Sequence, residues 1–575
     1  MRTFLTIMQL AFLTVSCSGA NNNSSKLIWS EMGPTVFEKA KAENKIILLN
    51  LEANWCHWCH VMEDSTYSNQ EIISYINKHF IPVKADQDAN PELSIRYRDY
   101  GWPATIFINA KGEDIVKRAG YISPEYFLKL LKAIVADPSL EEPIPDIRAK
   151  KINSSEVQLQ IERLIKNAKN AVDYEKGGFD QSQKYVEFAT FEYALFLSQD
   201  DKMRAWIKTS MNGAKKLSDP VWGGIYQYST HNDWNHLHFE KLLSIQARYL
   251  KLFSYNYLYN KDNESLDKAK DILMYLDRFL AHENGLYSNA QDADLVQGEH
   301  SEVYFKLNNS ERLKLGVPKV DTNTFTNNNA EIASSFLMMS DVLMDPKMQE
   351  KAIVIEKLLR QRKSENGLFF HDYGKREVFS LKDQIAMAYL YIDLIKSGLN
   401  DSFYTNELTR LIIAVNEFFI LENGSAQSFV GSNGLQPAPI IIENINLGRI
   451  NNWVFNLTKD KIYQVRSREL FNFCMNPQVI TQYYSLPELL LFENELNSEA
   501  NQFVFIDNEN SSTLLRSARA MAPYYSLFGI YTKDTLPEEK KKLFEGFKQN
   551  VLFVCTSNYC SSPIQSIEEV FEYYR

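Results

Sequence analysis

The spacing of apolar and polar positions changes along the chain, and its first part predicts a mixed α/β domain. Residues 46–51 form an apolar run that is typical of a strand buried on both faces. Further strands are predicted at residues 80–86, 105–108 and 115–118, and helices at 35–44, 61–79 and 126–135. This order of elements predicts an α/β domain over residues 31–137.

Helical spacing dominates from residue 151 to 495, after a proline-rich segment at 138–150 that we interpret as a linker. Helices are predicted at 156–171, 188–198, 203–217, 239–259, 265–281, 329–344, 348–362, 380–397 and 404–422. Gly-aromatic phrases follow many of them, at 177–179, 223–226, 285–287 and 367–369. Such a recurrence is typical of a helical array. In a closed ring of hairpins these loops line a cleft on one face; alternatively, they only end helices.

Short apolar runs return in the last stretch, residues 500–575. Strands are predicted at 502–506, 525–531 and 551–554, which indicates a small α/β region. The predicted fold class is therefore multidomain: an α/β domain, an all-α (α/α) toroid and a small α/β C-terminal region.

The first 17 residues predict export. A basic start, an apolar run over residues 4–15 and Ser16 before Cys17 resemble the signal peptide and lipobox of a bacterial lipoprotein. Cys17 would then carry the lipid, and residues 18–30 would form a polar tether. The alternatives are a cleaved secretory signal and an uncleaved apolar anchor. The lipid is the only membrane contact expected, because the other apolar runs are too short to span a bilayer.

Bulk composition limits the partners. The chain has 575 residues, 45% hydrophobic and 23% charged, as expected for a globular protein of several domains. Its net charge of −10 argues against nucleic acid as a partner.

The first candidate site is the dithiol Cys56-x-x-Cys59, which follows a predicted buried strand and opens a helix. A sulfur at a helix N-terminus is favoured as thiolate, so Cys56 is the expected attacking thiol and Cys59 the resolving one. His57 and His60 would lower the pKa of Cys56 or relay protons. Pro103 precedes an apolar strand about 45 residues later, where a cis proline facing the dithiol would dock substrates.

Three other interpretations of this motif stay open. Cys56-x-x-Cys59-His60 also fits c-type haem attachment, but haem sites are seldom set between a buried strand and a long helix. Zinc held by both cysteines, His57 and His60 is awkward, because four ligands within five residues strain a tetrahedral site. A purely structural disulfide is the third interpretation. Neither a metal nor a cofactor is predicted.

Residues 56–62 (CHWCHVM) and 101–103 (GWP) resemble the spermatogenesis-associated thioredoxin-like family. The helical part resembles it too, at 223–226, Trp234, 238–242 and 288–294, and so do Cys555, Cys560 and Pro563 near the end. The resemblance implies a thioredoxin-like domain followed by an α/α toroid similar to six-hairpin glycosidases and N-acylglucosamine 2-epimerases.

The chain departs from that family at four places. Residues 87–94 replace an acidic-Arg-Pro phrase, and a Gly-rich insertion after the Pro103 strand is missing. Leu237 stands where a proline is usual, and residues 382–384 (KDQ) replace Asp-Asp-Tyr. The altered toroid motif puts an enzymatic role for the toroid in doubt.

Candidate cleft residues of the toroid are His238 and Glu240 at a predicted helix start, Trp234 beside them, and Asp292 and Asp294 in the next Gly-aromatic loop. Paired carboxylates with an aromatic platform suit sugar chemistry. An epimerase would instead use histidine bases, for which His238, His231 and His371 are candidates. The alternative is that these residues only cap helices.

The leading functional prediction is thiol–disulfide exchange on exported proteins, with thiol or disulfide client proteins as partners. The alternative is a carbohydrate-active or carbohydrate-binding protein whose thioredoxin-like part is structural. Cys555 and Cys560 are predicted either to close a small loop as a second disulfide or to remain two buried thiols.

Overall fold

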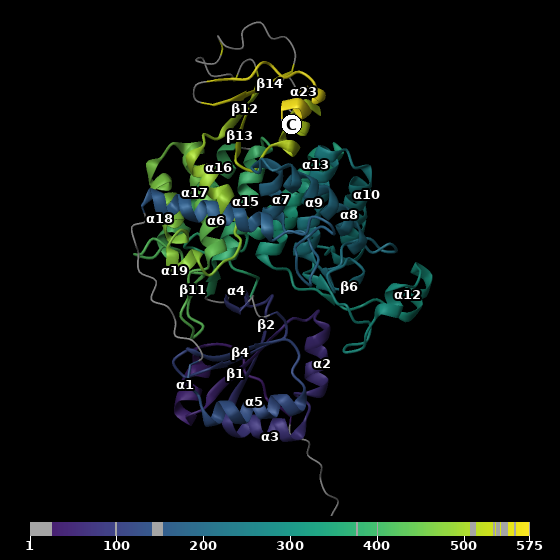
Figure 1. Cartoon of the computed structure of the whole chain (residues 1–575), viewed down its shortest axis with the longest axis vertical. Helices are drawn as coiled ribbons and strands as arrows, with labels where there is room; N and C mark the ends of the chain where they lie inside the picture. Colours follow the sequence, from purple (N-terminus) through teal and green to yellow (C-terminus); the bar gives the residue numbers. More distant parts are fainter. Residues whose placement is uncertain are drawn as a thin grey trace, which may run out of the picture.

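The computed structural model consists of three parts stacked along its long axis (Figure 1). It describes residues 26–97, 101–140, 153–374, 378–399, 401–506, 513–532, 535, 541, 550–556 and 559–573. The predicted signal segment with Cys17, and most of the predicted linker, lie outside these residues. Among the described helices, none is long and apolar enough to cross a bilayer.

The first part is the α/β domain that the sequence predicts. Its sheet has the order β2-β1-β3-β4, with β1 parallel to β2 and antiparallel to β3. The strands are β1 (Ile46–Glu52), β2 (Phe80–Asp86), β3 (Ala104–Ile108) and β4 (Asp114–Ala119). The helices are α1 (Pro34–Glu43), α2 (His57–Ser65), α3 (Gln70–His79), α4 (Pro91–Tyr97) and α5 (Pro124–Ala136).

The single helix predicted over residues 61–79 is wrong. The chain forms two helices, α2 and α3, because Asn69 caps the second. Its side chain accepts hydrogen bonds from the N–H groups of Glu71 and Ile72, at 3.0 and 3.2 Å. Helix α2 begins directly after Cys56, so the dithiol occupies its first turn.

The second part is a closed ring of helical hairpins. Its inner helices each contact the next, in the order α9, α13, α15, α17, α20, α7 and back to α9. They are α7 (Phe188–Phe196), α9 (Leu243–Asn260), α13 (Thr326–Leu343), α15 (Leu381–Lys396), α17 (Ile441–Thr458) and α20 (Pro487–Asn497). Their partners are α6 (Ser154–Asn170), α8 (Asp201–Ala214), α10 (Asn263–Tyr275), α14 (Pro346–Arg360), α16 (Asp401–Phe419) and α18 (Lys461–Cys474). The predicted α/α toroid is confirmed.

The third part is a small α/β unit at the other end of the toroid from the dithiol domain (Figure 1). Its sheet has the order β13-β12-β14, from β12 (Asn501–Ile506), β13 (Ser526–Tyr531) and β14 (Val551–Cys555). Helix α21 (Thr513–Met521) packs on α9 and α13, and α23 (Ile567–Tyr573) packs on α21. Cys555 and Cys560 are joined by a disulfide beside β14. The Cys555–Cys560 disulfide and the Cys56–Cys59 pair lie at opposite ends of the molecule (Figure 1). Their sulfur atoms are therefore too far apart to exchange a disulfide within one chain.

Candidate functional site

The dithiol lies at the N-terminus of α2, where the α/β domain meets the loops of the toroid. Cys56 and Cys59 are joined by a disulfide, and the Cys59 N–H donates to Cys56 Sγ at 3.2 Å. The two cysteines are only 5% and 3% exposed. They pack with Trp55 of their own domain and with Ala290 and Leu242 of the toroid. The toroid therefore covers the dithiol.

The segment before β3 lies on the same side of the α/β domain. The Trp102–Pro103 peptide bond is cis. Trp102 packs against the cluster that holds both cysteines, so the second sequence motif lies next to the first.

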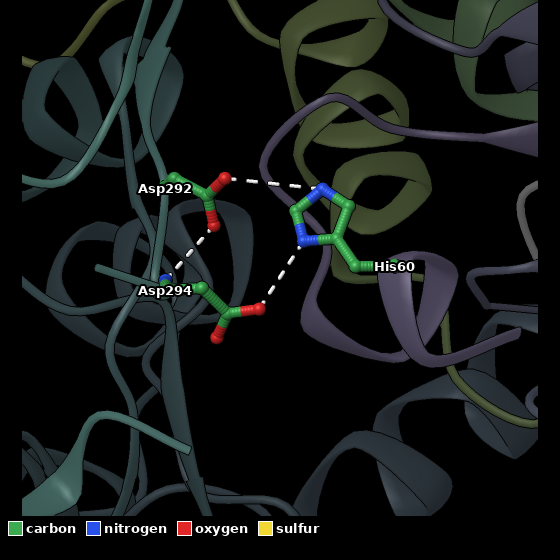
Figure 2. Close-up of side chains that lie close together, drawn as sticks. All are labelled: His60, Asp292 and Asp294. Carbon is green, nitrogen blue, oxygen red and sulfur yellow. Dashed lines mark hydrogen bonds and ion pairs between the residues drawn. The ribbon is translucent and has the colours of Figure 1, made fainter. Parts of the chain in front are cut away.

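Both histidines of the dithiol motif pair with carboxylates of the toroid, and Figure 2 shows the contacts of His60. His57 Nδ1 lies 2.8 Å from Asp294 Oδ1, and His60 Nδ1 lies 3.2 Å from Asp294 Oδ2. His60 Nε2 lies 3.8 Å from Asp292 Oδ2. Asp292 and Asp294 follow β8 (Ala290–Gln291), which pairs with β7 (Lys241–Leu242). The predicted redox motif and the predicted cleft carboxylates thus form one site.

The two carboxylates differ in pKa. Burial acts to raise the pKa of Asp294, but hydrogen bonds from His57 and His60 outweigh it and lower that pKa to about 2. Burial raises the pKa of Asp292 to about 6. For His60, burial acts to lower the pKa, but the hydrogen bond to Asp294 and the charges of both aspartates raise it. Asp294 therefore favours the protonated form of His60, beside the buried and weakly acidic Asp292.

A cavity of about 530 Å³ opens beside His57 and Trp58 and continues into the toroid. His238 and Glu240 line it, with His238 Nδ1 4.0 Å from Glu240 Oε2. Burial raises the pKa of Glu240 to about 8, and burial together with the nearby His57 lowers the pKa of His238 to about 4. At neutral pH both groups are uncharged, which leaves a carboxylic acid beside a free imidazole.

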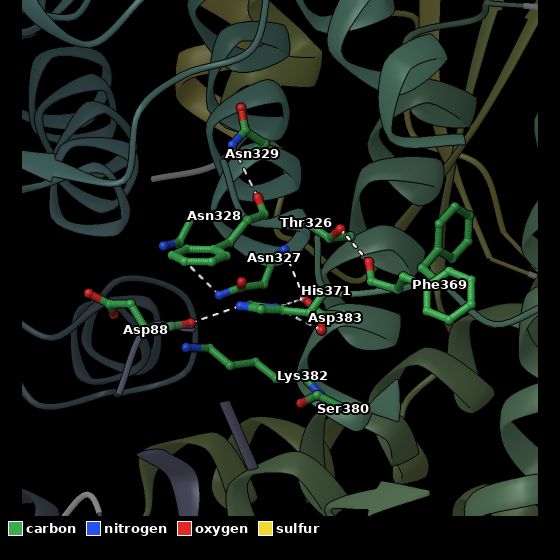
Figure 3. A network of polar contacts seen from close by, with 12 residues as sticks. Asp88, Thr326, Asn327, Asn328, Asn329, Phe369, His371, Ser380, Lys382 and Asp383 are labelled. Carbon is green, nitrogen blue, oxygen red and sulfur yellow. Dashed lines mark hydrogen bonds and ion pairs between the residues drawn. The ribbon is translucent and has the colours of Figure 1, made fainter. Parts of the chain in front are cut away.

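A loop of the α/β domain holds the two parts together (Figure 3). Asp88 Oδ2 accepts hydrogen bonds from Trp55 Nε1 at 2.6 Å and from Asn289 Nδ2 at 2.8 Å. His371 Nε2 lies 2.8 Å from the Asp88 carbonyl oxygen, and its Nδ1 lies 2.9 Å from Asp383. Both nitrogens of His371 are thus engaged, so it is not free to act as the base of an epimerase in this arrangement.

Two other toroid residues lie differently from the sequence prediction. Trp234 is not part of the cavity wall: its ring packs over Gly213, and its indole N–H donates to the Lys176 carbonyl at 2.7 Å. It is a core residue. His238 does not start a helix. It ends strand β6 (His236–His238) and stacks on Tyr228 of β5 (Tyr228–Thr230), while α9 begins only at Leu243. His231 lies in the β5–β6 turn with positive φ and contacts His236.

Sequence reasoning missed Asp88, Asn289 and His300 as parts of this site. His300 packs on His57, with ring centroids 4.1 Å apart, and lines the cavity. Asn289 lies in the 288–294 motif, from which the sequence predicts only Asp292 and Asp294 as cleft residues. Asp88 and Lys382 both lie in segments that depart from the family pattern. The two segments meet here (Figure 3). Lys382 is close enough to Asp88 for its positive charge to act on the Asp88 carboxylate.

The loop that carries Asp88 predicts a pH dependence of stability. Burial and the neighbouring Asp88 raise the pKa of Asp86 to about 7. An acid whose pKa rises on folding contributes stability that is complete below about pH 4 and is lost as the pH rises through about 7. We expect the free energy of unfolding to fall across this window and Asp86→Asn to reduce the slope. Urea unfolding at several pH values measures both, and equal slopes in the two proteins would contradict the prediction.

Comparison with known proteins places the first part of the chain. Residues 18–138 match the family model Thioredox_DsbH, described as "Protein of unknown function, DUF255". Among individual proteins, the disulfide bond reductase DsbH of Chlamydia pneumoniae is 22% identical to this chain over 129 residues. The match covers 18% of this chain and 78% of that protein.

The resemblance to the spermatogenesis-associated proteins extends past the Thioredox_DsbH region and is confirmed. Mouse spermatogenesis-associated protein 20 is 28% identical over 308 residues, which cover 46% of this chain. The match spans 38% of the mouse protein's length. Among solved structures, cellobiose 2-epimerase from Bacillus thermoamylovorans matches with a TM-score of 0.46 at 14% identity, over 56% of this chain and 86% of the epimerase.

Proposed function

We propose that the chain is a thiol–disulfide oxidoreductase of exported proteins, with Cys56 as the attacking thiol and Cys59 as the resolving one. The position of Cys56 carries this proposal. It caps the N-terminus of α2, and its sulfur accepts the Cys59 N–H. Free N–H groups and the helix dipole favour a thiolate there. The printed name of the chlamydial relative, disulfide bond reductase, supports reduction as the direction.

The proposed reaction moves two electrons from the dithiol to a client. The Cys56 thiolate attacks one sulfur of a client disulfide, forms a mixed disulfide and releases the other client sulfur as a thiolate. The Cys59 thiolate then attacks the Cys56 sulfur, which closes the Cys56–Cys59 disulfide and releases the reduced client. A separate dithiol reductant must restore the reduced pair before the next cycle.

Access to Cys56 is part of the proposal. Ala290 and Leu242 of the toroid pack against the dithiol, so a folded client reaches the sulfur only when the thioredoxin-like domain and the toroid separate. The contacts that resist separation include the pairs of Asp294 with His57 and His60 and the hydrogen bonds of Asp88, together with a buried apolar cluster that joins Phe37 to Phe429 and Leu435 of the toroid. Separation therefore breaks these polar pairs and exposes apolar side chains of both parts.

Trapping of clients by the full-length protein tests the proposal. Cys59→Ser is expected to accumulate mixed disulfides with client proteins, because the resolving thiol is missing, whereas Cys56→Ser is expected to trap none. Both variants carry Cys474→Ser, which removes the buried free thiol. Non-reducing gels followed by mass spectrometry identify the bonded sulfur. Equal trapping by both variants, or none by either, would contradict exchange through Cys56.

The cavity favours a second candidate function, which is the binding or conversion of a carbohydrate. Its walls combine aromatic rings, among them Tyr226, Phe239 and Phe305, with the imidazole of His238 and the carboxyl group of Glu240. Aromatic platforms with a few polar groups are typical of small-ligand sites. A carbohydrate activity would survive in a Cys56→Ser, Cys59→Ser double variant, and thiol–disulfide exchange would not.

A further inference from the structure

His60, Asp292 and Asp294 form a compact group of side chains from two parts of the chain (Figure 2). Each offers one nitrogen or oxygen atom, and these three atoms lie within 4.8 Å of one another. His60 comes from the first turns of α2, and the two aspartates come from the toroid loop after β8. All three point to a common centre between the thioredoxin-like domain and the toroid.

One buried oxygen atom at this centre accepts no hydrogen bond from the described residues. Asp292 is 2% exposed, and its Oδ1 accepts the Asp294 N–H at 2.9 Å. Its Oδ2 accepts no hydrogen bond among the described residues and faces His60 Nε2 at 3.8 Å. Buried carboxylate oxygens without donors are costly unless a cation is present.

We propose that one divalent transition-metal cation of the zinc class binds here, with a ring nitrogen of His60 and carboxylate oxygens of Asp292 and Asp294 as ligands. Imidazole and carboxylate ligands suit zinc. Their atoms lie about 2.0–2.2 Å from the ion, so two ligands of one ion are about 3–4 Å apart. His60 Nδ1 and Asp294 Oδ2, 3.2 Å apart, fall in that range. Asp292 Oδ2 lies 3.8 Å from the other ring nitrogen, Nε2, and one atom from each of the three residues lies within 4.8 Å of the others, so the side chains close by about 1 Å to share one ion.

Neighbouring groups complete the site. His57 Nδ1 contacts both oxygens of Asp294, at 2.8 and 3.0 Å, and holds this carboxylate in place, as groups around metal ligands commonly do. Gln297, an exposed residue, lies 3.4 Å from His60 Nε2, so the group is reached from solvent on that side. The bound ion would link the thioredoxin-like domain to the toroid. Sequence alone did not predict this metal, because its ligands come from distant segments.

Zinc binding to the full-length protein tests this proposal without relying on dithiol chemistry. All proteins carry Cys56→Ser and Cys59→Ser, so that thiolates do not bind the metal. Equilibrium dialysis against buffered Zn²⁺, with metal analysis of the protein, is expected to give one tight site per chain. Asp292→Asn, which keeps the shape but removes the charge, is expected to weaken that site at least about tenfold.

A surface pair of the same chemistry supplies the matched control. Asp233 pairs with His236 at 2.9 Å in the exposed β5–β6 hairpin, so Asp233→Asn removes an equivalent charge away from the site. Asp233→Asn is expected to leave zinc affinity unchanged. Thermal unfolding with and without zinc reports both folding and binding, because a ligand of the folded state raises the midpoint. Equal zinc binding by the parent and Asp292→Asn proteins, or none by the parent, would overturn the proposal, and neither result bears on exchange through Cys56.

Discussion

Replacing Arg449 with alanine is expected to destabilise the toroid by about 3–5 kcal/mol, which is the cost of breaking a buried ion pair from one side. Arg449 lies on the inner helix α17, and its guanidinium donates to Glu495 of α20 at 2.6 Å and to Glu192 of α7 at 3.1 Å. All three side chains are buried. Without the arginine, two carboxylates would face each other in the ring with no cation between them. Each would then bind a proton or draw in water, and both cost stability.

Urea unfolding monitored by circular dichroism measures this effect as a lower midpoint. Arg466→Ala is the control, because Arg466 pairs with Glu469 at 2.7 Å on the half-exposed outer helix α18, where such pairs contribute at most about 1 kcal/mol. Replacing all three buried charges together by Met and Leu is expected to recover most of the loss, since an apolar set needs no cation. An Arg449→Ala midpoint equal to that of Arg466→Ala would show that the triad does not hold the ring closed.

Much of the fold could be predicted from the sequence because it follows local patterns. The apolar run at 46–51 became β1, and the helix predicted at 348–362 became α14 (Pro346–Arg360). The errors occurred where a single side chain or a distant strand determines where a helix begins or ends. Asn69 splits one predicted helix in two by capping the second. Residues 239–242 have helical spacing, but the last two of them form the short strand β7. Lys241 and Leu242 pair with β8 instead of forming the hydrogen bonds of a helical turn.

The sequence predicts most residues of the candidate site, but it does not predict that they lie together. His57 and Asp294 are separated by 237 positions in the sequence, and neither local spacing nor propensity reports a contact over that distance. The sequence therefore predicted two separate sites, a dithiol and a toroid cleft. The structure joins them, because α2 points its first turn at the loop after β8. Trp234 shows the opposite error: its motif suggested a cleft residue, but its ring fills the space above Gly213.

The toroid covers the dithiol, and we expect this cover to have a larger effect on the reactivity of the Cys56–Cys59 disulfide than any other feature of the site. Asn289 is central to it, because one amide group donates to Asp88 at 2.8 Å and to Asp321 at 3.0 Å. This amide is a neutral donor between the half-buried carboxylate of Asp88 and the buried carboxylate of Asp321. Its replacement by a carboxylate of the same shape removes both hydrogen bonds and places three acids together, which is strongly unfavourable in a buried setting.

Asn289→Asp is therefore expected to release the Asp88 loop and to speed reduction of the Cys56–Cys59 disulfide by dithiothreitol at least about tenfold, because the dithiol is shielded by the toroid. The gain should be larger at about pH 8 than at about pH 5, where protonation of the clustered acids relieves their repulsion. Alkylation of the released thiols followed by mass spectrometry of the peptides measures the rate for each disulfide separately. The Cys555–Cys560 bond, at the far end of the molecule, is an internal reference whose rate should not change.

The matched variant is Asn212→Asp, which adds the same charge on the exposed face of α8 and should leave both rates unaltered. Circular dichroism checks that both variants keep their helices. If Asn289→Asp stays folded and its Cys56–Cys59 bond is reduced no faster than that of Asn212→Asp, the toroid does not control access to the dithiol. The burial of Cys56 would then be a property of the thioredoxin-like domain itself. A faster rate confined to Asn289→Asp would instead establish the contact between Asp88 and Asn289 as the point at which the two parts separate.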